Sequence, residues 1–137
     1  MADYAIIKGL ISLTDKLLSI FGKFQKAKRD QRDRVAFYCE QISDTLSEAY
    51  ESLERGEIPH GCCSSMDSYM HHLREVLAET LSKEEYEDLR DVLAVAYHVE
   101  YIDRELEELN RKGSKYAELD IAAGKFKAIS DKLRATN

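Results

Sequence analysis

The sequence predicts an all-α protein, an up-and-down antiparallel bundle of four to five helices that forms a single domain over residues 1–137. Three observations lead to this prediction. Apolar residues recur at steps of three and four, the period of a helix with one buried face. Pro59 is the only proline and there are six glycines, so few positions interrupt long helices. The chain is also long enough to bury a core of its own.

The first predicted helix covers about residues 2–28. Its apolar positions, which include two phenylalanines, are Ile6, Ile7, Leu10, Leu13, Leu17, Leu18, Ile20, Phe21 and Phe24. A second helix is predicted over about residues 32–55, and Gly56 is well placed as the left-handed residue that ends it. The loop 56–61, which contains Pro59, separates it from a third helix over about residues 62–81.

The clearest local signal is a helix start at Ser82. Ser82 and Glu85 have the spacing of a capping box, and Leu81 and Tyr86 have the spacing of the hydrophobic staple that accompanies one. A fourth helix is therefore predicted over about residues 83–111. Ser114 is the expected cap of a fifth helix over about residues 115–133. In the alternative, the fourth and fifth helices bend through Gly113 without a full reversal.

The charge is unevenly distributed along the chain. The net charge is −6, yet residues 1–34 contain eight basic and four acidic residues. An acidic body does not attract nucleic acid through its overall field. The basic cluster over residues 23–34 has one aromatic residue, Phe24, on the predicted apolar face, and no aromatic residues interleaved with its basic residues to stack on bases. We therefore expect no nucleic-acid partner. The absence of a signal-peptide pattern and of a long apolar run, with three cysteines, predicts a cytoplasmic location.

The sequence predicts no enzyme, no cofactor and no small-molecule substrate. A di-iron bundle needs two Glu-x-x-His pairs on helices, but Glu57 and His60 form the only such pair and lie in the predicted loop. Phosphate-binding glycine loops and the Gly-x-Ser-x-Gly pattern are also missing.

One alternative uses thiol or metal chemistry around residues 60–63. His60, Cys62 and Cys63, with His71 and His72, supply zinc-ligand atoms, and Cys62 falls near a predicted helix start, where thiols become more acidic. The spacing departs from the usual zinc patterns. The simpler interpretation is a buried Cys63 and surface histidines.

The first helix allows two interpretations. Its apolar face is that of a core helix, but the face lies beside a local excess of lysine that includes Lys8, Lys16, Lys23 and Lys26. Such a helix either serves the core alone or also contacts an anionic membrane surface. The eight tyrosines give a further expectation: they lie at the edge of the core and, if exposed together, form a patch for a protein partner.

One segment resembles a known group of proteins. The run Leu53-x-x-Gly56-Glu57-Ile58-Pro59-His60-Gly61-x-Cys63, followed by Tyr69 and Leu73, and later Glu100, Glu105, Leu106 and Leu109, is similar to a small helical domain of bacterial, chiefly cyanobacterial, proteins of unknown function. The resemblance covers about residues 30–110. It implies a helical bundle and no activity. A more distant, architectural likeness is to the HeLo and mixed-lineage-kinase-like four-helix bundles.

Three hypotheses follow. The first is a non-enzymatic helical-bundle module that binds protein, either another copy of itself or a different chain. The second is a membrane-associating bundle that acts through its basic, amphipathic N-terminal helix. The third is a small metal- or thiol-dependent protein centred on residues 60–63.

Overall fold

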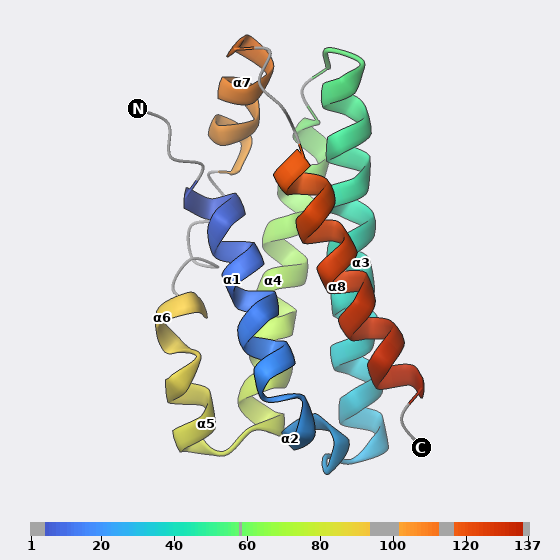
Figure 1. Ribbon diagram of the computed structural model, residues 1–137, viewed down its shortest axis with the longest axis vertical. Coiled ribbons are helices and arrows are strands. Elements are labelled where there is room, and N and C mark those ends of the chain that lie inside the picture. The colour runs from blue at the N-terminus through green and yellow to red at the C-terminus, as the bar shows by residue number, and fades with distance from the viewer. Residues whose placement is uncertain (1–4, 58, 94–101, 113–116, 136–137) are drawn as a thin grey trace.

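The computed structural model describes residues 5–57, 59–93, 102–112 and 117–135, and these ranges contain helices and no strand. The elements are α1 (Ala5–Ser19), α2 (Phe21–Gln25), α3 (Arg29–Glu54), α4 (His60–Thr80), α5 (Lys83–Asp88), α6 (Arg90–Leu93), α7 (Ile102–Lys112) and α8 (Ala117–Ala135). In Figure 1, α1, α4 and α8 run in one direction, and α3 and the α5–α6 arm run in the other. The predicted all-α, up-and-down bundle is confirmed.

The central element is α3, whose 26 residues make it about 39 Å long. It packs antiparallel against α4 on one side and against α8 on the other. The arms made by α1, α3, α4, α5–α6 and α8 alternate in direction. The first and last arms therefore run the same way, and α1 and α8 lie side by side as a parallel pair.

The predicted helix over residues 2–28 is interrupted at Ile20, so its expected extent is wrong. Ile20 has φ −108° and ψ 19°, and it separates α1 from α2. The Ser19 hydroxyl and the Ile20 amide both donate to the Lys16 carbonyl, at 2.7 and 3.2 Å, which closes the end of α1. The change of direction allows Phe24 of α2 to be fully buried against the core.

Helix α3 begins at Arg29, slightly earlier than predicted, and its first turns are tied to α2. The buried guanidinium of Arg32 donates from Nη1 to the carbonyls of Gln25, at 3.0 Å, and Ala27, at 3.3 Å. These carbonyls lie at the C-terminal end of α2, where the helix dipole stabilises a cation. Arg32 therefore fixes the turn between α2 and α3.

The end of α3 is the one predicted. Gly56 has a φ of 77°, which a residue with a Cβ adopts only with strain. The Glu57 amide donates to the Ser52 carbonyl at 2.9 Å, and the Gly56 amide donates to the Leu53 carbonyl at 3.0 Å, which is the Schellman pattern. Helix α4 then begins at His60, so the predicted loop is shorter than expected.

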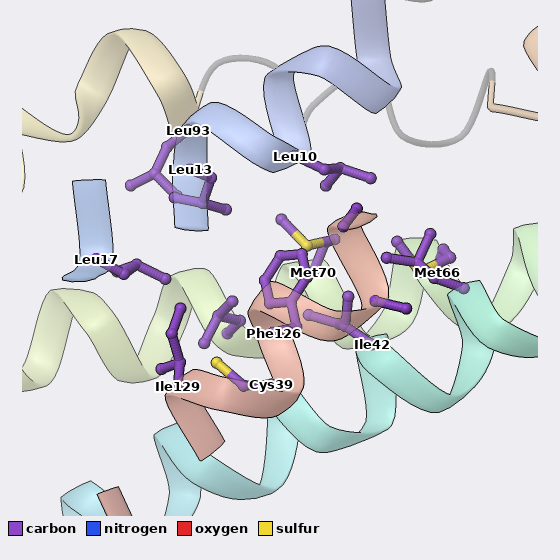
Figure 2. Packing of buried hydrophobic residues seen from close by; sticks show 14 of the residues in the cluster. Leu10, Leu13, Leu17, Cys39, Ile42, Met66, Met70, Leu93, Phe126 and Ile129 are labelled. Carbon is purple, nitrogen blue, oxygen red and sulfur yellow. The ribbon is translucent and has the colours of Figure 1, made fainter. Parts of the chain in front are cut away.

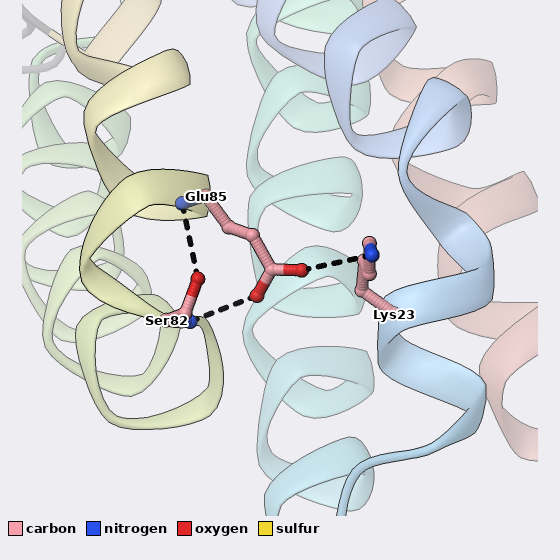
Figure 3. A network of polar contacts seen from close by, with 3 residues as sticks. All are labelled: Lys23, Ser82 and Glu85. Atoms are coloured by element: carbon pink, nitrogen blue, oxygen red, sulfur yellow. Dashed lines mark hydrogen bonds and ion pairs between the residues drawn. The ribbon is translucent and has the colours of Figure 1, made fainter.

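The predicted capping box at Ser82 is confirmed. The Glu85 amide donates to the Ser82 hydroxyl at 3.2 Å, and the Ser82 amide donates to Glu85 Oε1 at 2.8 Å. The second Glu85 carboxylate oxygen lies 3.3 Å from Lys23 Nζ, so the cap of α5 also holds α2 (Figure 3). Because its backbone and hydroxyl donors all favour the charged form, the pKa of Glu85 lies below its ordinary value.

The predicted fourth helix over residues 83–111 is broken, which corrects the expectation of one continuous element. The Leu89 amide donates to the Tyr86 carbonyl three residues back, at 3.0 Å, and this tighter turn separates α5 from α6. Leu89 and Leu93 both remain buried across the break. Helices α7 and α8 run in opposite directions in Figure 1, so they are separate helices, while Gly113 and Ser114 lie outside the described residues.

The core is continuous from α1 to α8, and Phe126 and Met70 lie near its centre (Figure 2). Most of the positions predicted to face inward on α1, α3, α4 and α8 are buried, while Leu18, Tyr38 and Tyr50 are only partly buried. Cys63, also predicted to face inward, lies outside the described residues. Helices α3 and α8 approach closely where small residues meet. The buried Ser43 hydroxyl of α3 donates there to the main-chain carbonyl of Ala123 in α8 at 2.7 Å.

The start of α1 is capped from a distant part of the chain. Glu105 of α7 accepts hydrogen bonds from the Ile6 amide at 2.9 Å and from the Ile7 amide at 3.2 Å. A carboxylate at this position satisfies donors that the helix itself leaves unpaired. Desolvation nevertheless raises the pKa of Glu105 above its ordinary value, against the lowering effect of the two amides.

Candidate partner-binding surface

Four rings form a row on the side of the bundle where α3 and α4 meet. Phe37 meets Tyr38 edge to face at 5.2 Å between centroids, and Tyr38 stacks on His72 at 5.4 Å with 16° between the planes. His71 completes the row, 6.2 Å from His72. We call Phe37, Tyr38, His71 and His72 the aromatic row. Adjacent residues on each helix supply the row, and the antiparallel packing of α3 on α4 joins the two pairs.

Charged side chains flank the aromatic row. Glu75, one turn along α4, lies 3.1 Å from His71 Nε2 and 4.0 Å from His72 Nδ1. Arg34 of α3 pairs with Glu79 of α4 at 3.0 Å. Both charged groups of that pair are about half exposed, so the pair contributes little to stability and mainly fixes the register of the two helices.

Phe37 is the unusual member of the row because it is 46% exposed. Among the described residues only Ile121, on α8, is a large hydrophobic residue with comparable exposure, at 48%. Phe37 lies off the buried stripe of α3, two positions from both Val35 and Cys39. Phe37 was not among the residues predicted to form a site, although an aromatic residue at an outward position of an amphipathic helix is a visible signal. The aromatic row therefore places exposed ring surface among the polar residues that usually fill the outer face of a bundle helix.

The four lysines of the N-terminal region, Lys8, Lys16, Lys23 and Lys26, are all exposed. Lys23 pairs with Glu85. The opposite face of α1 is in the core, where Ile6, Ile7, Leu10, Leu13 and Leu17 are at most 8% exposed. The core role predicted for this face is confirmed, and a membrane role for the lysines stays a prediction.

The outer face of α1 also carries a hollow that is largely open to solvent. It is lined by Ser12, Asp15, Lys16 and Ser19, and Asp15 accepts a hydrogen bond from Lys125 of α8 at 2.6 Å. Because the hollow is open to solvent, it differs from the enclosed pockets in which proteins hold small molecules.

Residues 60–63 form the first turn of α4 rather than a loop. The side chains of His60, Cys62 and Cys63 lie outside the described part of the structure, so the thiol or metal site stays a prediction. Within the described ranges, no group of three histidine, cysteine, aspartate or glutamate residues is arranged to hold a metal ion. Burial raises the pKa of Cys39 to about 12, so this third cysteine stays a protonated thiol at neutral pH.

The tyrosines follow the expectation in part. Tyr38, Tyr50, Tyr69 and Tyr86 are partly buried and pack against the edge of the core, as predicted. Of these, Tyr38 belongs to the aromatic row. The other four, Tyr4, Tyr97, Tyr101 and Tyr116, lie outside the described residues.

The class of protein that this fold defines is a small all-helical bundle. No protein-family model, no curated protein and no solved structure matches the chain. Over the ranges that the structure describes, no helix has both the length and the apolar character needed to cross a membrane.

Proposed function

We propose that the protein is a non-enzymatic interaction module that binds a protein partner through the aromatic row on α3 and α4. The observation that carries the proposal is the exposure of Phe37 within a row of packed rings. Aromatic residues are enriched in protein interfaces and supply much of their binding energy, because a partner removes a large apolar area from water. The proposal extends the resemblance to a cyanobacterial helical domain, which by itself supplies no activity.

Phe37 packs against a neighbour that the folded bundle already holds in place. Tyr38 is already held by the core and by His72, so the ring that Phe37 packs against is in place before any partner binds. A preordered anchor loses little conformational entropy on binding. Burying the remaining exposed part of Phe37 is worth about 2 kcal/mol at the usual area coefficient, with more from contacts along the row.

The test is site-specific crosslinking. A photoreactive phenylalanine analogue replaces Phe37 in one variant and Ile121 in a second, and both are irradiated in cells that naturally make the protein. We expect a discrete adduct from position 37 and none, or a different pattern, from position 121, which is equally exposed on another helix. Equal yields of the same adducts from both positions, or none from position 37, would overturn the proposal.

A second candidate function is association with an anionic membrane surface, favoured by the exposure of Lys8, Lys16 and Lys26. Turning α1 outward would expose five buried aliphatic side chains at about 1.5–3 kcal/mol each, comparable to the whole stability of a domain. Contact would therefore use the lysines with α1 still in the bundle. Flotation with anionic vesicles tests this candidate: native protein should float at low salt, and a variant with the three lysines changed to glutamate should not. Equal behaviour of both proteins would rule it out.

A further inference from the structure

The charge of the molecule is concentrated on the two helices that carry the aromatic row. Helices α3 and α4 contain ten acidic and four basic residues, a balance of −6, and the rest of the chain contains sixteen of each. The whole net charge of −6 therefore belongs to this helix pair. A charge concentrated in this way sets the electrostatic character of the surface that a partner meets.

Four of the seven acidic residues of α3 share a face with Phe37. Asp33, Asp44, Glu48 and Glu51 lie four, seven, eleven and fourteen positions from Phe37, spacings that place residues on one side of a helix. All four are exposed. We call Asp33, Phe37, Asp44, Glu48 and Glu51 the acidic stripe. From Asp33 to Glu51 it spans about 27 Å along α3.

We propose that the acidic stripe and the aromatic row bind a basic amphipathic helix of another protein, with an apolar side chain on Phe37 and lysines or arginines over the flanking carboxylates. This inference rests on the proposed function and names the class of its partner. The length of the stripe fits about 18 residues of a helix lying along α3.

Charge argues against the other occupants of this surface. In a symmetric dimer each copy presents the same patch, so two acidic stripes would face each other around the two Phe37 side chains. Like charges across an interface suppress association. The same field repels nucleic-acid phosphates and anionic lipid.

The test uses defined peptides and the full chain. Fluorescence anisotropy measures binding of an 18-residue amphipathic peptide made of lysine and leucine, and of a matched peptide with glutamate in place of lysine. We expect the basic peptide alone to bind, with affinity that falls as salt is added. The variant Phe37→Ser should weaken binding, and Ile121→Ser, the exposed control on α8, should not.

A second pair of variants isolates the stripe from the general acidity of the protein. Asp44→Asn with Glu48→Gln and Glu51→Gln removes three charges from the stripe, and Glu84→Gln with Glu87→Gln and Asp88→Asn removes three exposed charges from α5. We expect about tenfold weaker binding for the stripe variant and about twofold or less for the control. Equal weakening of both, equal binding of the acidic peptide, or a concentration-dependent dimer lost in Phe37→Ser would overturn the inference.

The two experiments distinguish the interaction module from the basic partner. Adducts from position 37 in cells, together with no preference for the basic peptide, would overturn the basic partner and leave the interaction module in place. No adducts from position 37 and no effect of Phe37→Ser on peptide binding would overturn both.

Discussion

The α3–α8 pair differs in construction from the three short helices α5, α6 and α7, which are together called the arm below. Helices α3 and α8 are continuous, have 26 and 19 residues, and approach closely enough for the Ser43 hydroxyl to reach the α8 backbone. Helices α5, α6 and α7 have six, four and eleven residues, and carboxylates tie this arm to the N-terminal region. Glu85 contacts α2 through Lys23, and Glu105 caps α1. The α3–α8 pair is therefore stabilised mainly by close packing. The arm depends more on polar contacts, which respond to pH and salt.

The largest expected effect comes from breaking the well-packed region. Phe126 of α8 is fully buried at the centre of the core, so Phe126→Ala leaves a cavity among α1, α3 and α4. We expect a loss of about 4 kcal/mol in the free energy of unfolding, measured with urea. The matched variant Phe126→Leu should lose about half as much. A loss below about 1 kcal/mol for the alanine variant would show that the α3–α8 pair is not closely packed.

A smaller effect is expected where α3 meets α8. Ser43→Ala removes the donor to the Ala123 carbonyl and leaves only a small void. The carbonyl is not left unpaired, because it belongs to the hydrogen-bonded backbone of α8. We expect a loss of about 1 kcal/mol in urea unfolding. The larger side chain in Ser43→Leu should be worse than alanine, since the two backbones leave no space for it. A leucine variant more stable than the native protein would show that α3 and α8 are not closely packed at Ser43.

The capping box tests the arm by itself. Ser82→Ala removes one hydrogen bond from the first turn of α5, and we expect a loss of about 1 kcal/mol. Hydrogen exchange should quicken for the amides of α5 and change little for those of α3 and α8, because the arm opens locally. Ser82→Asp, which also caps helices, should preserve slow exchange. Uniformly faster exchange throughout the molecule would instead show that the arm and the core open together.

The smallest effect separates the two carboxylates of the arm by pH. The pKa of Glu85 is lowered, so its stabilisation is present at neutral pH and lost as pH falls through and below the ordinary carboxyl range. The pKa of Glu105 is raised, so its contribution to stability falls as pH rises from the ordinary value through the raised one. The free energy of unfolding, measured from pH 3 to 7, should fall less at low pH in Glu85→Gln than in the native protein. In Glu105→Gln it should fall less as pH rises. Identical pH profiles for both variants and the native protein would contradict this assignment.

The sequence predicted the long helices better than the arm. The buried stripe of α8, with Phe126 and Ile129, repeats at steps of three and four without interruption, and the Schellman turn at Gly56 and the cap at Ser82 are local patterns. The breaks at Ile20 and Leu89 carry no glycine or proline of their own, and the apolar period continues across both. They arise from tertiary packing that places Phe24 and Leu93 in the core, which no local rule reports.

The candidate site was less predictable than the fold. The sequence drew attention to lysines and to His60, Cys62 and Cys63, because those residue types have recognisable chemistry. The aromatic row needed the register between α3 and α4, since Tyr38 and His72 are 34 positions apart and meet only in the folded bundle. Phe37 alone was visible from the sequence, as an aromatic residue on the outward side of α3.

The cap on α1 affects how the protein folds while it is being synthesised. The Ile6 amide and the Glu105 carboxylate that accepts its hydrogen bond are separated by 99 positions, and α8, which flanks α1 in parallel, is made later still. On a ribosome that adds about 5–20 residues per second, α1 therefore waits for roughly 5–20 s with its aliphatic face uncovered. Helices α3 and α4 pack on each other and are both complete earlier. The order in which helices can pair therefore differs from the order in which they are synthesised. During that interval the apolar face of α1 lacks the later helices that cover it in the folded protein.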